Sequence, residues 1–198
     1  MRIAFLGVQG TGKSTLIKKI QDEKLLSYPE SPSVGRQMKA AGFVINEDAG
    51  SLDQSIALNY HLINWTKDNM LYARTFMDAL VYAQYAFNHG KITLADLNLA
   101  KEITKAMMPK YDILFYIEPE FDIVADGDRS TDVAFRDECA QILKNYIKEF
   151  DLKVIQLAGS VDARFELVRR VFEERAAAII RGAFDTYRDF KNKEFQGL

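Results

Sequence analysis

Nine residues near the start of the chain have the types and the spacing of a polyphosphate-binding loop. They are Gly7, Val8, Gln9, Gly10, Thr11, Gly12, Lys13, Ser14 and Thr15. The stretch matches G-x-x-x-x-G-K-[ST], in which glycines allow the backbone to turn its N–H groups toward phosphate oxygens. We expect Lys13 to reach the β- and γ-phosphates of a nucleoside triphosphate and the Ser14 hydroxyl to ligate Mg²⁺. The loop therefore predicts a site at which these residues bind ATP and Mg²⁺.

The segments on either side of the loop supply the context that it requires. Residues 2–6 form an apolar run that is typical of a buried parallel strand. Residues 15–20 continue as a helix, whose positive dipole end would lie behind the bound phosphates. A strand, a loop and a helix in this order favour a nucleoside triphosphate site over a chance glycine-rich turn.

The composition is that of one soluble domain. The chain has 198 residues, of which 48% are hydrophobic and 27% charged, with a formal net charge of −2. This balance gives no bulk attraction to DNA or to an acidic membrane. Cys139 is the only cysteine, which excludes an intramolecular disulfide, and we expect it in the core. Since no apolar run is long enough for a membrane span and no leader is visible before the first strand, we expect no membrane contact and a cytoplasmic location.

Two charged residues after the loop helix are candidates for the second half of the site. Residues 25–28 are predicted to form a short second strand. Glu30 follows two residues after its end, where its carboxylate could serve as a catalytic group in a substrate cleft. Arg36 lies on a helix expected over 33–41, where a guanidinium could hold a substrate phosphate. Each is equally well explained as a solvated surface residue.

A further pair lies where a strand gives way to a helix. The third strand is predicted over 70–73, with Arg74 at its carboxyl end and Asp78 one turn further on. Ligands of open parallel sheets bind outside the carboxyl ends of the strands, so Arg74 is a candidate to bind the acceptor and Asp78 a candidate catalytic carboxylate. An ordinary salt bridge at a helix start is the alternative. Tyr72 is a candidate to stack on a substrate base, with core packing as its alternative.

The rest of the chain continues the alternation of strands and helices. Further strands are predicted at 113–117 and 154–157, and further helices at about 51–67, 76–87, 93–109 and 133–150, after Gly159, and in a tail at about 181–198. Five strand signals that alternate with helices favour a single α/β domain with a five-stranded parallel sheet covered on both faces. The helix at 51–67 carries His61, which we interpret as a surface or satisfied histidine, and its exposed part could form a homodimer face.

An arginine-bearing loop between the fourth and fifth strands has the character of a lid. Residues 126–129 read Asp-Gly-Asp-Arg, and Arg136 follows in the next helix. Arginines on a lid would close over the transferring phosphoryl group and exclude water. We therefore expect a lid at about 120–136, with Arg129 and Arg136 as catalytic residues.

Together these features resemble the P-loop nucleoside and nucleotide kinases, in the branch of AAA-type NTPases that is similar to nicotinamide riboside kinases and phage deoxynucleotide kinases. The resemblance is carried by residues 7–15, by Arg74 with Asp78, and by residues 126–129 with Arg136. It implies a three-layer α/β/α sandwich with a small lid, and it implies that Gly159 lies in a loop beside the adenine of ATP. One position departs from the pattern: members often have an acid immediately before the third-strand arginine, and here that residue is Ala73. This leaves Glu30, Asp78 and Asp126 as candidates for a base or for completing the Mg²⁺ shell.

We interpret the sequence as that of an ATP-dependent kinase acting on a small-molecule nucleotide or nucleoside, with a deoxynucleoside monophosphate as the favoured acceptor. Arg36 and Arg74 would bind that acceptor, and Lys13 would hold the donor phosphates. Two alternatives stay open. A kinase that acts on DNA, at a 5′ end or a modified base, would use the same donor site, although the near-neutral charge disfavours it. A non-catalytic nucleotide-sensing ATPase is the other, and Ala73 keeps it open.

Overall fold

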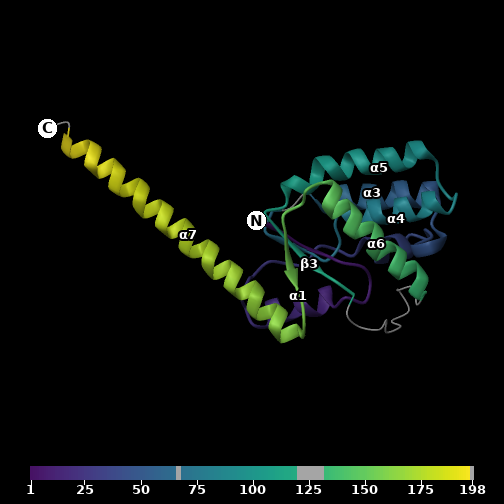
Figure 1. Cartoon of the computed structure of the whole chain (residues 1–198), viewed down its shortest axis with the longest axis horizontal. Helices are drawn as coiled ribbons and strands as arrows, with labels where there is room; N and C mark the ends of the chain where they lie inside the picture. The colour runs from purple at the N-terminus through teal and green to yellow at the C-terminus, as the bar shows by residue number, and fades with distance from the viewer. Residues whose placement is uncertain (66–67, 120–131, 197–198) are drawn as a thin grey trace. The chain divides into compact units, whose positions relative to one another are not determined.

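Four parallel strands form the sheet around which the described residues are arranged (Figure 1). The computed structural model describes residues 1–65, 68–119 and 132–196, with side chains as far as residue 182. The chain divides into two compact units, residues 1–159 and 160–198. The strands are β1 (Arg2–Leu6), β2 (Met70–Tyr72), β3 (Ile113–Ile117) and β4 (Val154–Leu157), in the spatial order β2-β1-β3-β4. Every neighbouring pair is parallel, which confirms the predicted α/β fold with a parallel sheet.

The fifth strand expected at 25–28 does not form, which corrects the predicted sheet to four strands among the described residues. The chain meets β2 a few residues later. There the Leu71 N–H donates to the Pro29 carbonyl at 2.9 Å, and the Ser31 N–H donates to the Leu71 carbonyl at 2.8 Å. Because Pro29 has no N–H and a second proline follows closely, the ladder does not extend beyond one bridge at Glu30. This bridge fixes the backbone of Glu30 beside β2.

Helices join the strands close to where the sequence predicted them. They are α1 (Lys13–Asp22), α2 (Val34–Ala40), α3 (Ser51–Asn64), α4 (Phe76–Asn88), α5 (Leu94–Met107), α6 (Val133–Glu149) and α7 (Val161–Gln196), with short 3₁₀ turns at Asn46–Asp48 and Met108–Lys110. The helix expected after Gly159 and the tail expected from residue 181 are, as far as Gln196, one continuous helix, α7. Within the described part of the chain, no helix has the length and the apolar content to cross a membrane.

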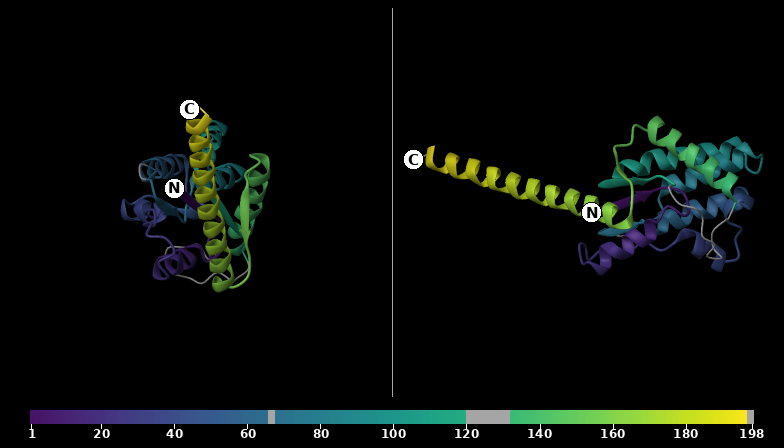
Figure 2. Two further views of the ribbon diagram at one scale, coloured as in Figure 1. Left: turned by 90° about the vertical axis from the view of Figure 1, so that its left-hand side faces the viewer. Right: turned by 60° about the horizontal axis from the view of Figure 1, so that its bottom comes forward.

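Side chains alternate between the two faces of the sheet and build a core on each side. On one face, Ala4 and Leu6 of β1 pack into a hydrophobic cluster with residues of α4, α5 and α6. On the other face, Phe5 stacks on Phe115 of β3, with ring centroids 5.3 Å apart. The right-hand view of Figure 2 shows the strands between α1 on one side and α5 and α6 on the other. The predicted three-layer arrangement is thus confirmed.

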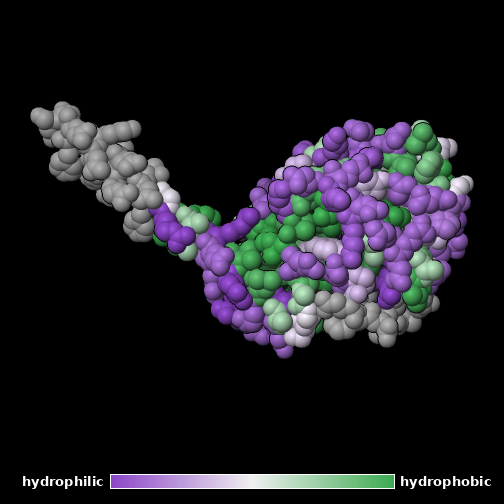
Figure 3. Space-filling view, in the orientation of Figure 1, coloured by the Kyte–Doolittle hydropathy of each residue, from purple (hydrophilic) through white to green (hydrophobic). Residues whose placement is uncertain are grey.

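β4 is an edge strand of the sheet, and its surroundings are apolar. Val154 and Ile155 are only half-buried. Hydrophobic side chains show at the surface around β4 in Figure 3. Gly159 comes two residues after the end of β4. Because β4 is parallel to β3, Gly159 lies at the same edge of the sheet as the loop after β1.

The loop after β1 packs so closely against β3 that only glycine fits at position 7. Gly7 has a φ of +148°, and a Cβ built on it would lie 2.6 Å from the Ile117 carbonyl oxygen. We predict that Gly7→Ala lowers the free energy of unfolding by about 2 kcal/mol, because the backbone must move to relieve the contact. Gly35→Ala is the control, since a Cβ there meets nothing within 4 Å. Urea unfolding followed by circular dichroism measures both variants, and equal midpoints would contradict the prediction.

Candidate active site

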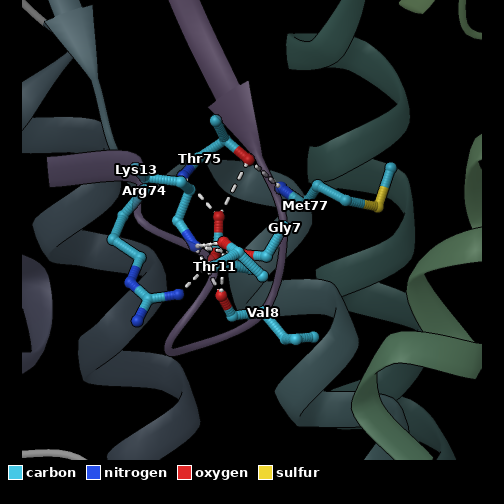
Figure 4. Close-up of polar contacts among 8 residues, drawn as sticks. Gly7, Val8, Thr11, Lys13, Arg74, Thr75 and Met77 are labelled. Carbon is cyan, nitrogen blue, oxygen red and sulfur yellow. Dashed lines mark hydrogen bonds and ion pairs between the residues drawn. The ribbon is translucent and has the colours of Figure 1, made fainter. Parts of the chain in front are cut away.

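The loop between β1 and α1 forms one wall of the site. Gly12 caps α1 with a left-handed backbone, at φ 84°, which lets the helix begin at Lys13. The Lys13 ammonium is buried inside the loop and donates to the carbonyls of Gly7 and Val8, the latter at 2.6 Å (Figure 4). Thr11 Oγ1 lies 3.2 Å from the same nitrogen and donates to the Val8 carbonyl. The loop therefore holds a positive charge at its centre, where a bound polyphosphate needs one.

A cleft of about 410 Å³ opens from this loop toward α2, α3 and the start of α4. Among the predicted site residues, its walls carry Gln9, Gly10, Thr11, Gly12, Lys13, Ser14, Glu30, Arg36, Arg74 and Asp78. These residues come from the loop, from the chain before and within α2, and from the junction between β2 and α4. The structure thus brings most of the predicted donor residues and most of the predicted acceptor residues into one space, large enough for a small organic ligand.

Glu30 lies where the loop meets the rest of the cleft. A side-chain hydrogen bond joins it to Ser14, and the Arg36 guanidinium is close enough to act on its charge. Burial raises the pKa of Glu30, while the charge of Arg36 and the Ser14 hydrogen bond oppose the rise. Ser14 and Glu30 thus offer neighbouring oxygen atoms at the start of α1, and oxygen is the ligand type that Mg²⁺ takes in proteins.

Asp78 fixes Arg74 and begins α4. Arg74 Nη1 donates to Asp78 Oδ1 at 2.8 Å, and Asp78 Oδ2 accepts from the Thr75 N–H at 2.8 Å. The Thr75 hydroxyl accepts from the Met77 N–H, so a capping box closes the first turn of α4 (Figure 4). Burial alone would lower the pKa of Arg74, but Tyr82 and Asp78 raise it overall. Both oxygens of Asp78 are therefore engaged in holding Arg74 and in capping the helix.

Three further cleft residues were missed as site candidates in the sequence. Gln54 and His61 on α3 are buried and line the cleft, and Tyr82 on α4 lines it near Arg74. Gln54 and His61 are two turns apart and share one face of α3. The sequence did contain an indication of this role, because two polar residues share a face of α3 with the apolar Leu58. From the sequence alone, however, such a face is interpreted as part of the hydrophobic core, because the cleft beside it cannot be seen.

Tyr72 does not line the cleft, which corrects its expected place in the acceptor site. Its ring is buried in the core and packs edge-on against Tyr111, with centroids 5.3 Å apart. The reason is the strand register: Tyr72 pairs with Ala4 of β1, so both side chains point to the face that α4, α5 and α6 cover. Its alternative, core packing, is what the structure shows.

Three residues expected at the ATP site are near the loop edge of the sheet without lining the cleft. Gly7 supports the loop from behind, against β3. Thr15 is exposed on the first turn of α1, and Gly159 is exposed after β4. Contacts of these residues with ATP therefore stay predictions.

The expected lid falls largely outside the described residues. Arg129 belongs to that part, so its role stays a prediction. Of residues 120–136, only the last five are described, and they begin α6. Arg136 is paired there with Asp137 at 2.8 Å and does not line the cleft.

Comparisons with known proteins agree with this architecture. A family model described as an AAA domain matches residues 2–164. The chain belongs to this AAA domain family. No curated protein matches its sequence significantly. The AAA-type resemblance inferred from the loop and from Arg74 is thereby confirmed at the level of the family.

Solved structures share the fold at low sequence identity. NadR protein in complex with NR has a TM-score of 0.62 and 18% identity, over 87% of this chain and 50% of that chain. Deoxyadenosine kinase from M. mycoides, with dCMP and dCDP bound, has a TM-score of 0.62 and 15% identity, over 88% of this chain and 99% of that chain. YorR protein from Bacillus subtilis, in complex with phosphorylated GDP, has a TM-score of 0.52 and 15% identity, over 88% of this chain and 97% of that chain. This chain thus spans half the length of the NadR chain. These similarities show that the chain shares its fold with these proteins, one of which is a deoxyadenosine kinase.

His61 gives the protein a stability that depends on pH. Burial lowers the pKa of His61 from 6.5 to about 4, with Asp78 opposing the shift and Arg74 adding to it. Between these values the unfolded chain binds a proton that the folded chain does not, so stability falls as the pH drops from 6.5 toward 4. We predict that His61 contributes a loss of about 2–3 kcal/mol over this window.

Urea unfolding of the wild type, His61→Asn and His89→Asn at pH 7.5 and pH 4.5 measures this contribution. His61→Asn should lose less stability than the wild type on acidification. His89→Asn, which changes the exposed second histidine, should keep the His61 contribution. Equal losses for the wild type and His61→Asn would show that His61 is protonated in the folded protein.

Proposed function

We propose that the protein is an ATP-dependent kinase that transfers the γ-phosphoryl group to a hydroxyl of a nucleoside. The observation that carries this proposal is the single cleft that joins Lys13 and Ser14 of the loop to Glu30 and Arg74. A phosphoryl donor held by the loop would face an acceptor in the same space, as in-line transfer requires.

The charges of the cleft favour a nucleoside over the monophosphate that the sequence favoured. On the acceptor side, Arg36 and Arg74 are offset by Glu30 and Asp78. A monophosphate brings about two negative charges and would need an excess of cations there. A nucleoside is neutral at its sugar, and its hydroxyl needs a base to accept the proton as it attacks. Of the candidate carboxylates within the described residues, Glu30, held beside Ser14, is the better placed for that role, since both oxygens of Asp78 are engaged.

The donor side has residues that fit Mg-ATP. Lys13 would hold the β- and γ-phosphates, and the backbone of the loop would bind the remaining phosphate oxygens. Ser14 would ligate Mg²⁺ through its hydroxyl oxygen. When bound, the metal neutralises charge on the transferring group. Arg74, fixed by Asp78, would hold the acceptor hydroxyl in line.

Part of the cleft lining suits an uncharged base. Besides the charged residues, Gln54 and apolar residues such as Met38 line the cleft. Asp53 also lies there, but its two oxygens accept from the N–H groups of Val44 and Gly50, each at 3.0 Å. The carboxylate is therefore engaged, and the amide of Gln54 offers a donor and an acceptor to a base.

The similar solved structures support this class of acceptor. Their names refer to NR, to deoxyadenosine, and to nucleotides that are bound or formed. Because the identities are below 20% and the NadR chain is twice as long as the matched part, the choice of base and sugar stays open. Homodimer formation, which the exposed face of α3 suggested, also stays a prediction.

Replacing Glu30 by glutamine tests the proposed base. We predict that Glu30→Gln lowers kcat for the nucleoside acceptor by about 10²–10⁴-fold, because the hydroxyl proton loses its acceptor. Binding of ADP should change little, since the loop contacts remain. The assay is ADP release from Mg-ATP with each nucleoside and each monophosphate, and with a short oligonucleotide.

Two controls give this assay its reference points. Lys13→Ala is the blank for the donor site, and Glu23→Gln removes an exposed carboxylate of similar chemistry just after α1. Stimulation by a monophosphate alone, or by the oligonucleotide alone, would replace the nucleoside by that acceptor. Tight ATP binding with no stimulation by any acceptor would favour the nucleotide sensor. Full activity of Glu30→Gln would remove Glu30 from the mechanism.

A further inference from the structure

Arg74 is held by a second side chain of α4 in addition to Asp78. Tyr82 lies one turn beyond Asp78 on the same face of the helix. A side-chain hydrogen bond joins its hydroxyl to the Arg74 guanidinium, which is the donor. Both Tyr82 and Arg74 line the cleft. The guanidinium is therefore fixed at two points, by a carboxylate and by a phenol oxygen.

The phenol is suited to this task because it stays neutral. Burial raises the pKa of Tyr82 to about 12, although the charge of Arg74 opposes the rise. The hydroxyl oxygen can therefore accept from Arg74 without adding a second negative charge beside Asp78. Arg74 is left with one formal counter-charge, so that its remaining donors can serve a ligand in the cleft.

The ring of Tyr82 is itself fixed by α6. Phe135, near the start of α6, stacks on the Tyr82 ring with centroids 5.8 Å apart and planes at 20°. Phe135 is almost completely buried and also meets Tyr85 edge-on at 4.6 Å. A contact of this kind restricts the ring to one orientation. The position of Arg74 therefore depends on packing between α4 and α6 as well as on its own helix.

We propose that Tyr82 is a positioning residue of the acceptor site, which aligns the Arg74 guanidinium on the nucleoside and is itself aligned by Phe135. This inference rests on the proposed function. Tyr82 was not among the site residues predicted from the sequence. Its hydroxyl acts on the acceptor site through Arg74, whereas its ring packs against Phe135.

The test removes one oxygen atom at two neighbouring tyrosines. Tyr82→Phe takes away the partner of Arg74 and keeps the stack on Phe135. Tyr85→Phe is the matched control, because Tyr85 is on the same helix and touches the same Phe135 but does not line the cleft. We expect Tyr82→Phe to raise KM for the nucleoside about 10–100-fold, as the loss of one hydrogen bond to a charged group predicts, with KM for ATP unchanged. Tyr85→Phe should change neither KM.

A double-mutant cycle separates positioning through Arg74 from a general effect on the fold. In an Arg74→Ala background, Tyr82→Phe should raise KM for the nucleoside no further, because the group that it positions is gone. A further increase of the same size in that background would overturn the proposal, as would equal KM values for Tyr82→Phe and Tyr85→Phe.

The wild type distinguishes the failure of this inference from the failure of the proposed function. If no nucleoside stimulates ADP release by the wild type, the proposed function is wrong and the inference fails with it. If the wild type is stimulated but Tyr82→Phe behaves as Tyr85→Phe does, only the inference fails. Thermal midpoints of the variants, which we expect to agree within a few degrees, exclude unfolding as the cause of a change in KM.

Discussion

The site depends on the parallel pairing of β1 with both β2 and β3. In this register Ala4 lies beside Tyr72 and Leu6 beside Tyr116, so all three strands end at one edge of the sheet. The loop after β1 and the Arg74 turn after β2 then begin at that edge as neighbours. The close contact of Gly7 with the carbonyl of Ile117 shows how little space separates the loop from β3. An antiparallel β2 would carry Arg74 to the opposite edge.

Charge balance determines what this edge can do. The Lys13 ammonium is buried and donates to the carbonyl oxygens of Gly7 and Val8, which places a positive charge inside the loop. Elsewhere in the cleft, Asp78 orients Arg74 and offsets its positive charge, while Glu30 adds a carboxylate that is hydrogen-bonded to Ser14. The two arginines of the cleft, Arg36 and Arg74, are thus accompanied by carboxylates that also line it. Under the proposed function, this balance suits transfer to an uncharged hydroxyl better than transfer to a second phosphate.

Much of this architecture could be predicted from the sequence, because its signals are local. The loop has a fixed spacing, the strand at 113–117 is a continuous apolar run, and the start of α4 follows from Thr75 and Asp78. The fifth strand was wrong because pairing needs N–H groups at specific positions, and Pro29 lacks one. The prediction for Tyr72 was wrong because β2 has only three residues, so that the side of the sheet to which Tyr72 points is determined by its pairing with β1. Gln54, His61 and Tyr82 were missed because they lie on helices whose inward faces look like core until the cleft is known.

The central claim is that the phosphoryl group leaves ATP for a nucleoside and does not go to water. The direct measurement is the stoichiometry of the products, with ATP labelled at its γ-phosphorus and the best nucleoside acceptor present at saturation. The account predicts one phosphorylated nucleoside for each ADP, with almost no label in inorganic phosphate. Label that appears in inorganic phosphate at the rate of ADP formation, with the nucleoside unchanged, would contradict it.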